Sequence, residues 1–333
     1  MKVSLKSAPA SFLTGAVLLA TSSFAFGSIT LIEDLLTDFT GVTTGDYTIR
    51  NSTSQGRLFV NGTFNRAFNN SVAVNTSVPH PNDNVSLYAR DFNLTGSARQ
   101  VVQNGGVVTS SSISQNRFEL QGQGNPTPFI NGHAGASATE NLLSSYGTSR
   151  SSFTHDVEQG SIDLANLASN ATVTRQRDNQ GNLNGLSFNA GSGLVIFDIA
   201  ASELFAQNVN PNINVSAQND AVIINVRGTG NVTQNNNNFN FSGNQNFAYS
   251  RVIWNFYQAD GLLDLDSIGG SVVAPQADVF IQGRVDGATI GRTLTHEGQL
   301  HIPTFGGMIV PEPSSGLLAS LLLFGFAVTR RSR

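Results

Sequence analysis

Short β-prone runs between turn residues constrain the fold of this chain most strongly, and they are clearest over residues 251–305. The runs there lie at 252–256, 262–265, 271–273, 279–281, 288–290 and 299–302. Turn dipeptides such as Asp260-Gly261 and Asp286-Gly287 separate them, which gives a step of about nine or ten residues. Strands this short cannot each bury a face alone. The pattern therefore predicts strands that stack on similar strands in one column.

The same rhythm extends through most of the chain. Strands are expected at 47–50, 57–60, 71–74, 85–89, 92–94, 100–102 and 107–108, and again at 172–174, 186–188, 194–199, 213–215 and 221–226. Residues 195–197 and 222–224 are continuously apolar, which is typical of strands buried on both faces. The pattern predicts an all-β fold.

Residues 151–168 break the β pattern with the one clear helix signal. Phe153, Val157, Leu164 and Leu167 fall on one helical face, although Gly160 weakens the middle. A single helix in a β-rich chain must lay this apolar stripe on a sheet. We therefore expect it to cover a sheet face or edge that would otherwise invite association.

Two further segments leave more than one interpretation open. Residues 31–36 suit a short amphipathic helix or a cap on the stacked strands. Residues 109–146 lose the strand rhythm and are rich in Ser, Gly and Gln. They predict a long surface excursion, which in a compact domain is either functional or poorly ordered.

Composition excludes several classes of protein. Only 12% of the residues are charged, whereas the 39% that are apolar are enough for a core. The chain has no Cys, which excludes disulfides and thiolate metal sites. Lys2 and Lys6 are the only lysines, and their removal would take the formal net charge from −4 to −6. A mildly acidic, lysine-free protein is a poor candidate for nucleic-acid binding, which needs a basic face.

Residues 1–27 predict a secretory signal. Lys2 and Lys6 form a basic start, and residues 12–20 form an apolar core. Small residues at Ala25 and Gly27 suit a cleavage site. We therefore expect an exported domain over residues 28–307.

Residues 308–333 predict a sorting tail. An apolar run at 316–328 is shorter than the roughly 20 residues that a full membrane span needs. A helix-breaking motif precedes the run and a basic stop follows it, formed by Pro311, Glu312 and Pro313 and by Arg330, Arg331 and Arg333. Such a basic end stays cytoplasmic by the positive-inside rule.

The order of motif, apolar helix and arginine cluster resembles the PEP-CTERM sorting signal. That resemblance implies processing by an exosortase-type enzyme in a Gram-negative bacterium that makes exopolysaccharide. The short C-terminal helix would then anchor the protein only transiently in the inner membrane. A plain single-pass anchor is the alternative.

A second resemblance rests on segments within the exported domain. These are residues 55–60 (QGRLFV), 194–199 (LVIFDI), 222–229 (VIINVRGT), 252–256 (VIWNF) and 270–277 (GSVVAPQA). Their order over residues 39–305 resembles the choice-of-anchor A domain of bacterial surface proteins. The turn at Asn61-Gly62 and the 109–146 insert depart from that family's pattern. The resemblance implies an adhesive or matrix domain with a right-handed β-solenoid fold, one helix packed alongside and no catalytic residues.

Histidines give no sign of a zinc enzyme. They are His80, His133, His155, His296 and His301, and none forms an HxxxH or HExxH pattern. His296 and Glu297 are neighbours, which a turn with a solvated pair explains most simply. Gly-rich runs lack the strand and helix context of a nucleotide site, and no GxSxG elbow occurs.

Carboxylates gather in the stretch 251–305. They are Asp260, Asp264, Asp266, Asp278 and Asp286. On stacked strands they could line a calcium site or form a glycosidase pair. The simpler interpretation is turn residues and solvated strand faces. No catalytic, cofactor-binding or metal-binding residue is therefore assigned.

Two polar or aromatic features have competing interpretations. The asparagine run at 235–238 suits a turn loop, or else a ladder of stacked amides. Trp254 is the sole tryptophan and could stack on a sugar, but an aromatic residue in a buried strand is usually part of the core.

The sequence favours a secreted, non-enzymatic structural or adhesive protein of the exopolysaccharide matrix. A stiff ladder would present Asn, Ser, Thr and Gln side chains that bind weakly many times. The expected partners are the exosortase-type enzyme, the inner membrane, and exopolysaccharide or a neighbouring cell surface, without nucleic acid or a cofactor.

Two other functions stay open. A polysaccharide-active enzyme, a lyase or glycosidase, requires that Asp264, Asp266 or Asp278 converge in a groove. An ice-binding protein requires a flat Thr-x-Thr ladder, to which only Thr293-Leu294-Thr295 and Thr172-Val173-Thr174 conform.

Overall fold

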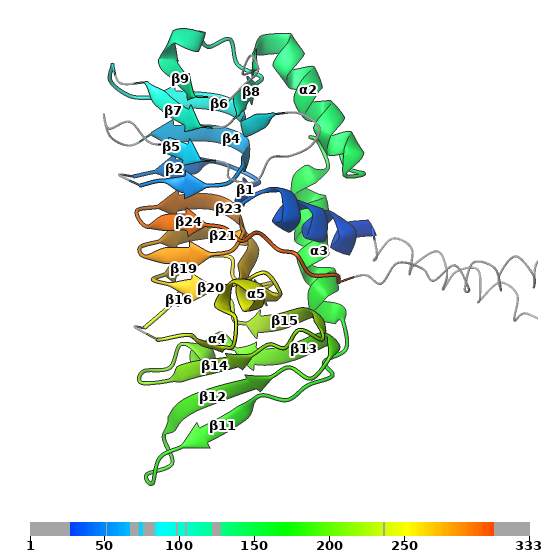
Figure 1. Ribbon diagram of the computed structural model, residues 1–333, viewed down its shortest axis with the longest axis vertical. Helices are drawn as coiled ribbons and strands as arrows, with labels where there is room; N and C mark the ends of the chain where they lie inside the picture. The colour runs from blue at the N-terminus through cyan, green and yellow to red at the C-terminus, as the bar shows by residue number, and fades with distance from the viewer. Residues whose placement is uncertain are drawn as a thin grey trace, which may run out of the picture.

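The computed structural model describes residues 27–50, 52–66, 73–75, 84–97, 99–103, 105–121, 128–235 and 237–309 (Figure 1). The predicted secretory signal, apart from Gly27, lies outside the described residues. So does the sorting tail from residue 310 onward, with its motif and basic stop. None of the helices that the structure describes is long and apolar enough to cross a membrane.

Strands dominate the described chain. They are β1 (Gly41–Thr43), β2 (Tyr47–Ile49), β3 (Ser54–Gln55), β4 (Leu58–Arg66), β5 (Ala73–Asn75), β6 (Val85–Leu94), β7 (Gln100–Gln103), β8 (Gly106–Thr109), β9 (Phe118–Gln121), β10 (Phe129–Ile130), β11 (Thr174–Arg177), β12 (Leu183–Asn189), β13 (Gly193–Ala200), β14 (Asn210–Asn214), β15 (Asn219–Arg227), β16 (Val232–Thr233), β17 (Asn240–Ser242), β18 (Val252–Asn255), β19 (Leu262–Leu265), β20 (Ile268–Gly269), β21 (Ser271–Ile281), β22 (Arg284–Asp286), β23 (Thr289–His296) and β24 (Gln299–His301). The predicted strand-rich fold is confirmed.

Helices lie mainly on one side of these strands (Figure 1). Residues 27–38 are helical, and the other helices are η1 (Gln115–Arg117), α2 (Gly132–Ser145), α3 (Phe153–Asn166), α4 (Ala201–Leu204) and α5 (Gln245–Tyr249). The helix predicted over 151–168 is present as α3. The prediction of a single helix is wrong, because α2 and residues 27–38 lie beside it. The irregular excursion predicted over 109–146 is also wrong, since this segment forms β9, β10 and α2.

Three sheets form the column. The 13-stranded sheet follows the order β10-β8-β6-β4-β1-β23-β21-β18-β15-β13, with β2, β16 and β19 off this path. A seven-stranded sheet follows β20-β22-β24-β3-β5-β7-β9, and a four-stranded sheet follows β11-β12-β14-β17. Within the described residues every strand pairing is parallel except that of β11 with β12. Parallel pairing of strands that are distant in sequence requires each strand to stack on its neighbour, as the sequence predicts.

The first and last strands of the fold meet in the middle of the column. Val42 of β1 aligns with Ile290 of β23, and Thr48 of β2 aligns with Thr295 of the same strand. β3 pairs with β24 in the same way. We call this contact of β1, β2 and β3 with β23 and β24 the seam. The chain builds one end of the column from the seam to β10, returns through α2 and α3, and builds the other end from β11 back to β23 (Figure 1).

Long strands of the large sheet bend and so serve two faces. The register shifts between Val60 and Thr63 of β4 and between Ala274 and Asp278 of β21. The first halves pair with β1 and β18, on the side of the helices. The second halves pair with β2 and β19. We call the outer surface of β2, β16, β19 and the second halves of β4, β6, β21 and β23 the open face.

Strands on the helix side are buried on both faces, as their apolar runs predict. Val222 and Ile224 point into the column, whereas Ile223 points to the helices. On β18, Trp254 likewise points into the column and Ile253 points to the helices. Each strand therefore joins an inner core to an outer core that the helices cover, which explains why its sequence does not alternate.

Helix α3 docks on the sheet through a small residue and a buried amide ladder. A Cβ on Gly160 would lie 2.6 Å from both Ile32 Cγ1 and Ser28 O, so only glycine lets the 27–38 helix cross this closely. Asn255 Nδ2 donates to Ser161 O at 2.9 Å and to Asn225 Oδ1 at 2.9 Å. Ser161 Oγ donates to Asn255 Oδ1 at 2.6 Å, and Asn225 Nδ2 donates to Leu164 O at 3.2 Å. These bonds fix the position of α3 along the column.

The edge strand at one end of the column is capped by the chain itself. Asn170 Nδ2 donates to Leu194 O at 2.9 Å, and Asn170 Oδ1 accepts from Ile196 N at 2.8 Å. The backbone N–H groups of Asn170 and Ala171 also donate to Ile196 O. Because these bonds occupy the exposed backbone of β13, they protect that edge from pairing with another chain.

Asn255 tests how far the buried amide ladder holds α3 in place. The Asn255→Leu variant keeps the number and branching of the side-chain heavy atoms but leaves Ser161 and Asn225 without this partner in the core. We expect the free energy of unfolding in urea to fall by about 2–4 kcal/mol. The exposed Asn93→Leu variant should change it by less than about 0.5 kcal/mol. Equal unfolding midpoints for the wild type and Asn255→Leu would contradict this role.

His296 lies buried at the seam. Its ring contacts the Tyr47 ring edge-on, with 5.5 Å between centroids. Its Nδ1 lies 2.9 Å from Gly298 O, which makes Nδ1 the donor. Burial is the main cause that lowers the pKa of His296 from 6.5 to about 4. The sequence interpretation of a solvated pair with Glu297 is wrong, because only Glu297 is exposed, where it pairs with Arg50 at 3.0 Å.

Stability at the seam should therefore depend on pH. The unfolded chain takes up a proton below pH 6.5, whereas folded His296 stays neutral to about pH 4. Stability is then full above pH 6.5 and falls by about 3 kcal/mol as the pH drops to 4. When the free energy of unfolding in urea is measured at each pH, His296→Asn should lose the part of the pH dependence that comes from this one proton. His155→Asn, on the exposed surface of α3, should keep it, and an unchanged slope in His296→Asn would refute the assignment.

Candidate binding surfaces

The open face alternates apolar side chains inward with polar side chains outward. Leu294 of β23 is fully buried, whereas Thr293 and Thr295 on either side of it are partly exposed. Phe64 of β4 is buried between Thr63 and Asn65 in the same way. This alternation is what a sheet with one solvated face requires.

Outward residues on the open face line up in two ranks across neighbouring strands. Strand register aligns the inner rank as Asn93, Asn65, Thr48, Thr295, Phe280, Asp264 and Thr233. The outer rank contains Asp91 aligned with Thr63, and Thr293 aligned with Asp278 and Leu262. Neighbours within a rank are about 4.8 Å apart, and the two ranks are about 6.7 Å apart.

The seam crosses the inner rank at Thr48 and Thr295. Thr48 comes from the beginning of the domain and Thr295 from its end, yet they are directly paired. Asn65 follows Thr48 in the same rank. The central part of the open face therefore exists only when the two ends of the domain have closed on each other.

An ion pair fixes one part of the outer rank. Arg292 donates to both oxygens of Asp278, at 3.0 and 2.7 Å, and Thr293 Oγ1 donates to Asp278 Oδ1 at 2.8 Å. Its hydrogen bond with Arg292 is the main cause that lowers the pKa of Asp278. Both side chains of this pair are nearly half exposed, so the pair adds little stability but holds both side chains close to the face.

A polar groove of about 670 Å³ lies between the four-stranded and seven-stranded sheets. One wall carries Asn210, Asn238 and Asn240, near β14 and β17. The opposite wall carries Arg284 and Asp286 of β22, together with residues 266–269. The end strands of the two sheets, β17 and β20, both border the groove, and neither sheet continues into the other there.

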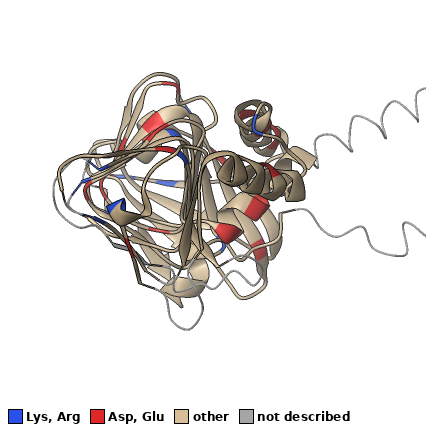
Figure 2. Cartoon of the chain, turned by 90° about the horizontal axis from the view of Figure 1, so that it is seen from above, with Lys and Arg blue, Asp and Glu red and all other residues tan. Residues whose placement is uncertain are grey.

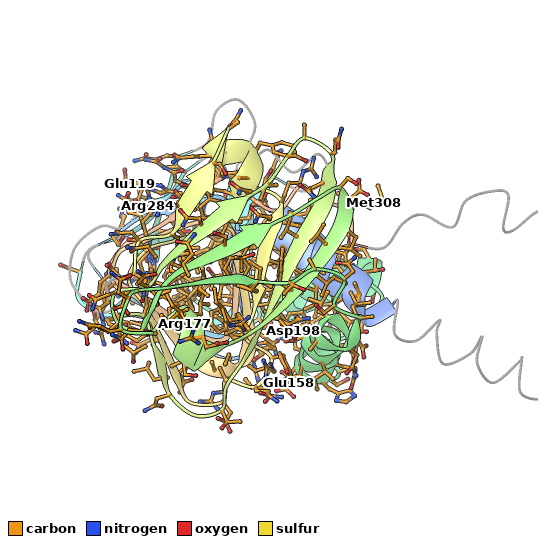
Figure 3. All side chains as sticks on the ribbon, turned by 90° about the horizontal axis from the view of Figure 1, so that it is seen from below. Glu119, Glu158, Arg177, Asp198, Arg284 and Met308 are labelled. Atoms are coloured by element: carbon orange, nitrogen blue, oxygen red, sulfur yellow. The ribbon has the colours of Figure 1, made fainter. Side chains whose placement is uncertain are left out.

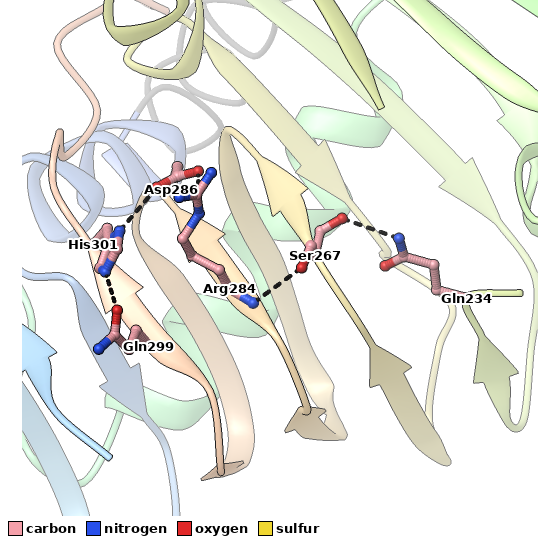
Figure 4. A network of polar contacts seen from close by, with 6 residues as sticks. All are labelled: Gln234, Ser267, Arg284, Asp286, Gln299 and His301. Carbon is pink, nitrogen blue, oxygen red and sulfur yellow. Dashed lines mark hydrogen bonds and ion pairs between the residues drawn. The ribbon is translucent and has the colours of Figure 1, made fainter. Parts of the chain in front are cut away.

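A network of hydrogen bonds and ion pairs holds the second wall (Figure 4). Asp286 is nearly buried. Its Oδ2 lies 2.9 Å from Arg284 Nε, and its Oδ1 lies 3.2 Å from His301 Nδ1. His301 Nε2 lies 2.6 Å from Gln299 Oε1. The partners of Asp286 therefore set the orientation of both of its oxygens.

The network continues along the same wall to Gln234 (Figure 4). Arg284 N donates to Ser267 Oγ at 3.2 Å, and Gln234 Nε2 donates to Ser267 O at 3.0 Å. Gln234 is buried, and its Oε1 accepts from Asp266 N at 3.1 Å. A buried amide thus anchors the exposed turn that carries Asp266 and Ser267.

Tyr249 places its ring in the groove because Gly269 has no side chain. A Cβ on Gly269 would lie 2.3 Å from Tyr249 Cε1. The Tyr249 ring also packs edge-on against Phe241, with 4.9 Å between centroids. Burial and then the negative charge of Asp286 raise the pKa of the Tyr249 hydroxyl. Trp254 Nε1 donates to Gly269 O at 2.8 Å and so fixes the backbone beneath the ring.

The candidate residues from the sequence lie in separate places. Asp264 and Asp278 lie on the open face, whereas Asp266 and Asp286 line the groove. Asp260 is a turn residue whose Oδ1 accepts from Gly230 N at 2.7 Å. The three carboxylates that the enzyme interpretation requires therefore do not converge. No group of three or more His, Asp or Glu residues within the described chain is arranged to hold a metal ion.

The remaining candidates resolve as follows. Trp254 is fully buried, which confirms that it belongs to the core. Residues 235 and 237–239 form a loop, the simpler of the two interpretations for the asparagine run. Asn237 stabilises that loop by donating to Ala206 O at 3.0 Å and Val209 O at 2.6 Å. Thr172 and Thr174 lie near the β11 end of the column, far from the rank that contains Thr295.

Sequence reasoning missed the roles of Asp286, His301 and Tyr249. Asp286 precedes Gly287 and so matches a turn dipeptide, yet it is a nearly buried acceptor. His301 stands alone in the sequence because its partner lies on the neighbouring strand β22. Only the register of β22 and β24 brings the two together.

Charge is sparse over the molecule (Figure 2). A group of acids, Glu33, Asp34 and Asp38, lies on the 27–38 helix. Burial, followed by the charges of Asp38 and Glu33, raises the pKa of Asp34 to about 6.

Arg284 and Glu119 lie on the side of the column away from Met308 (Figure 3). The groove wall and the end of the described chain therefore lie on different sides.

Comparison with known proteins places the chain in a family. The protein-family model described as "Putative Ice-binding-like adhesive domain" matches residues 32–302. A search of curated proteins finds no match.

Similar solved structures include ice-binding proteins. One from the Antarctic ascomycete Antarctomyces psychrotrophicus is 10% identical, with a TM-score of 0.37 over 82% of this chain and 98% of that chain. One from an Antarctic biological consortium is 13% identical, with a TM-score of 0.30 over 80% and 88%. A glycosylated one from an Arctic yeast is 9% identical, with a TM-score of 0.33 over 84% and 95%. On the family match, which spans most of its length, the chain belongs to the ice-binding-like adhesive domain family.

Proposed function

We propose that this protein is a non-enzymatic adhesive domain of the cell surface that binds polysaccharide of the extracellular matrix through its open face. The observation that carries the proposal is the inner rank, in which Asn93, Asn65, Thr48 and Thr295 point outward on successive strands. Each of these side chains can donate and accept a hydrogen bond, as sugar hydroxyls also do. The family match supports the adhesive role.

Strength would come from repetition on a rigid surface. A single hydrogen bond contributes only about 0.5–1.5 kcal/mol, but a polymer can form many at once. The strands that carry the rank are held by parallel ladders and a buried core, so little side-chain or backbone freedom is lost on binding. We propose that the stacked strands form a right-handed β-solenoid, whose length sets the number of contacts.

The proposed location on the cell surface fits the positions of the two ends of the described chain. Ile309 N donates to Glu33 Oε2 at 2.9 Å, and Phe305 N donates to Leu36 O at 3.0 Å. Residues 27 and 309 therefore leave the fold beside the helices. Attachment through the PEP-CTERM-type tail, whether transient until an exosortase acts or lasting, would leave the open face and the groove accessible to matrix polymers.

Ice binding is the second candidate function. The observation that favours it is the outward pair Thr293 and Thr295 on either side of buried Leu294. The same face also carries the Arg292–Asp278 ion pair and the ring of Phe280, which interrupt a regular threonine array. We therefore expect no thermal hysteresis beyond that of a control protein of equal size, measured by nanolitre osmometry.

A bulky side chain on the inner rank should block adhesion without disturbing the core. The Thr295→Tyr variant keeps a residue with high β propensity on β23 but raises a ring above the flat face. We expect its retention on exopolysaccharide purified from the producing organism to fall at least fivefold. Retention is measured as the protein eluted from the immobilised polymer.

The matched control is Thr174→Tyr on the fully exposed strand β11. It adds the same ring to a strand outside the open face and should bind as the wild type does. Equal retention of Thr295→Tyr and Thr174→Tyr would show that the open face is not the adhesive surface.

A further inference from the structure

The groove between the two smaller sheets has the composition of a site for a hydroxyl-rich ligand. Asn210, Asn238 and Asn240 supply amides that both donate and accept. The facing wall supplies a guanidinium from Arg284 and a carboxylate from Asp286. Within the part of the chain that the structure describes, the side chains of Asn238 and Asn240 form no hydrogen bond, so both remain able to bind a ligand.

The facing wall is organised before any ligand arrives. Asp286 is held between Arg284 Nε at 2.9 Å and His301 Nδ1 at 3.2 Å (Figure 4). Buried Gln234 holds the turn at Ser267 through a hydrogen bond of 3.0 Å. A ligand that used these groups would not have to order them, which favours binding of a small, flexible molecule.

Two aromatic rings complete the lining, those of Tyr249 and Phe239. Tyr249 packs edge-on against Phe241, and its ring fits against the backbone of Gly269 because that residue has no side chain. The apolar C–H surface of a pyranose ring packs favourably against such an aromatic ring, while its hydroxyls need polar neighbours. Aromatic rings set among amides therefore suit a sugar unit better than an apolar peptide side chain.

Charge limits the class of sugar. The lining contains the carboxylates of Asp266 and Asp286 and the guanidinium of Arg284, which is already paired with Asp286. The excess is therefore negative, and it would repel uronic acids and sulfated sugars. We propose that the groove is a binding site for a neutral hexopyranose unit of a polysaccharide, with Tyr249 beneath the ring and Asn240 and Asp286 on its hydroxyls.

This assignment rests on the proposed adhesive function for its ligand class, but it concerns a different surface. The open face would hold a polymer through many weak contacts along the column. The groove would hold one sugar unit through a few directed contacts. Short soluble oligosaccharides test the groove alone, because they gain little from repetition.

The test uses the full chain and five probes in isothermal titration. Four are neutral, namely maltohexaose, laminarihexaose, cellohexaose and mannohexaose, and the fifth is hexagalacturonate. We expect at least one neutral probe to bind more tightly than hexagalacturonate. Tyr249→Ala and Asn240→Ala should each weaken that binding, the first at least fivefold. Thr295→Tyr, on the open face, should leave it unchanged.

Asn240→Ala keeps the test decisive if Tyr249→Ala fails to fold, because Asn240 is exposed on the rim. The proposal is overturned if no neutral probe binds, if hexagalacturonate binds most tightly, or if Asn240→Ala binds as the wild type does. If the groove binds oligosaccharide while Thr295→Tyr is still retained on the polymer, the open face is not the adhesive surface. The assignment of the groove would then stand.

Discussion

Parallel pairing across the seam is the contact on which the rest of the structure depends. β1 and β2 pair with β23, and β3 pairs with β24, so the first and last strands of the domain are neighbours in the middle of the column. At the seam the two halves of the column are joined only by strand pairing, because the paired strands lie at opposite ends of the domain sequence. The seam buries Tyr47, Ile49 and Leu294 and leaves Thr48 beside Thr295 on the surface. A single contact thus completes both the core and the proposed adhesive rank.

Local pattern in the sequence was enough to predict the strand-rich fold and helix α3. Apolar runs such as 222–224 have one explanation, burial on both faces, and the outer core confirms it. Helix α2 escaped prediction because its sequence offers only a short apolar stripe around Leu143. Its helical state is stabilised by the surface it covers, which no local pattern encodes. The seam was equally invisible, because it pairs strands from opposite ends of the domain.

Two glycines show why the candidate site could not be predicted from residue types. Gly160 looks like a defect in a helix, but the 27–38 helix crosses at that point and leaves no room for a Cβ. Gly269 looks like an ordinary turn residue, but it makes the space that Tyr249 fills. In both cases the residue matters for what approaches it from a distant part of the chain. Asp286 is similar, since its turn dipeptide is plain while its burial depends on β24.

Low charge gives the two proposed surfaces a common physical character. Only 12% of the residues are charged, and the sole lysines lie at positions 2 and 6. Attraction between exposed charges is screened over about 8 Å at physiological ionic strength, whereas hydrogen bonds and ring contacts at direct contact are much less affected. The proposed binding of a hydroxyl-rich polymer to a surface of threonine and asparagine would therefore depend little on salt concentration. Such binding needs fixed geometry instead of charge, and the closed seam together with the buried amide ladder beneath α3 supplies it.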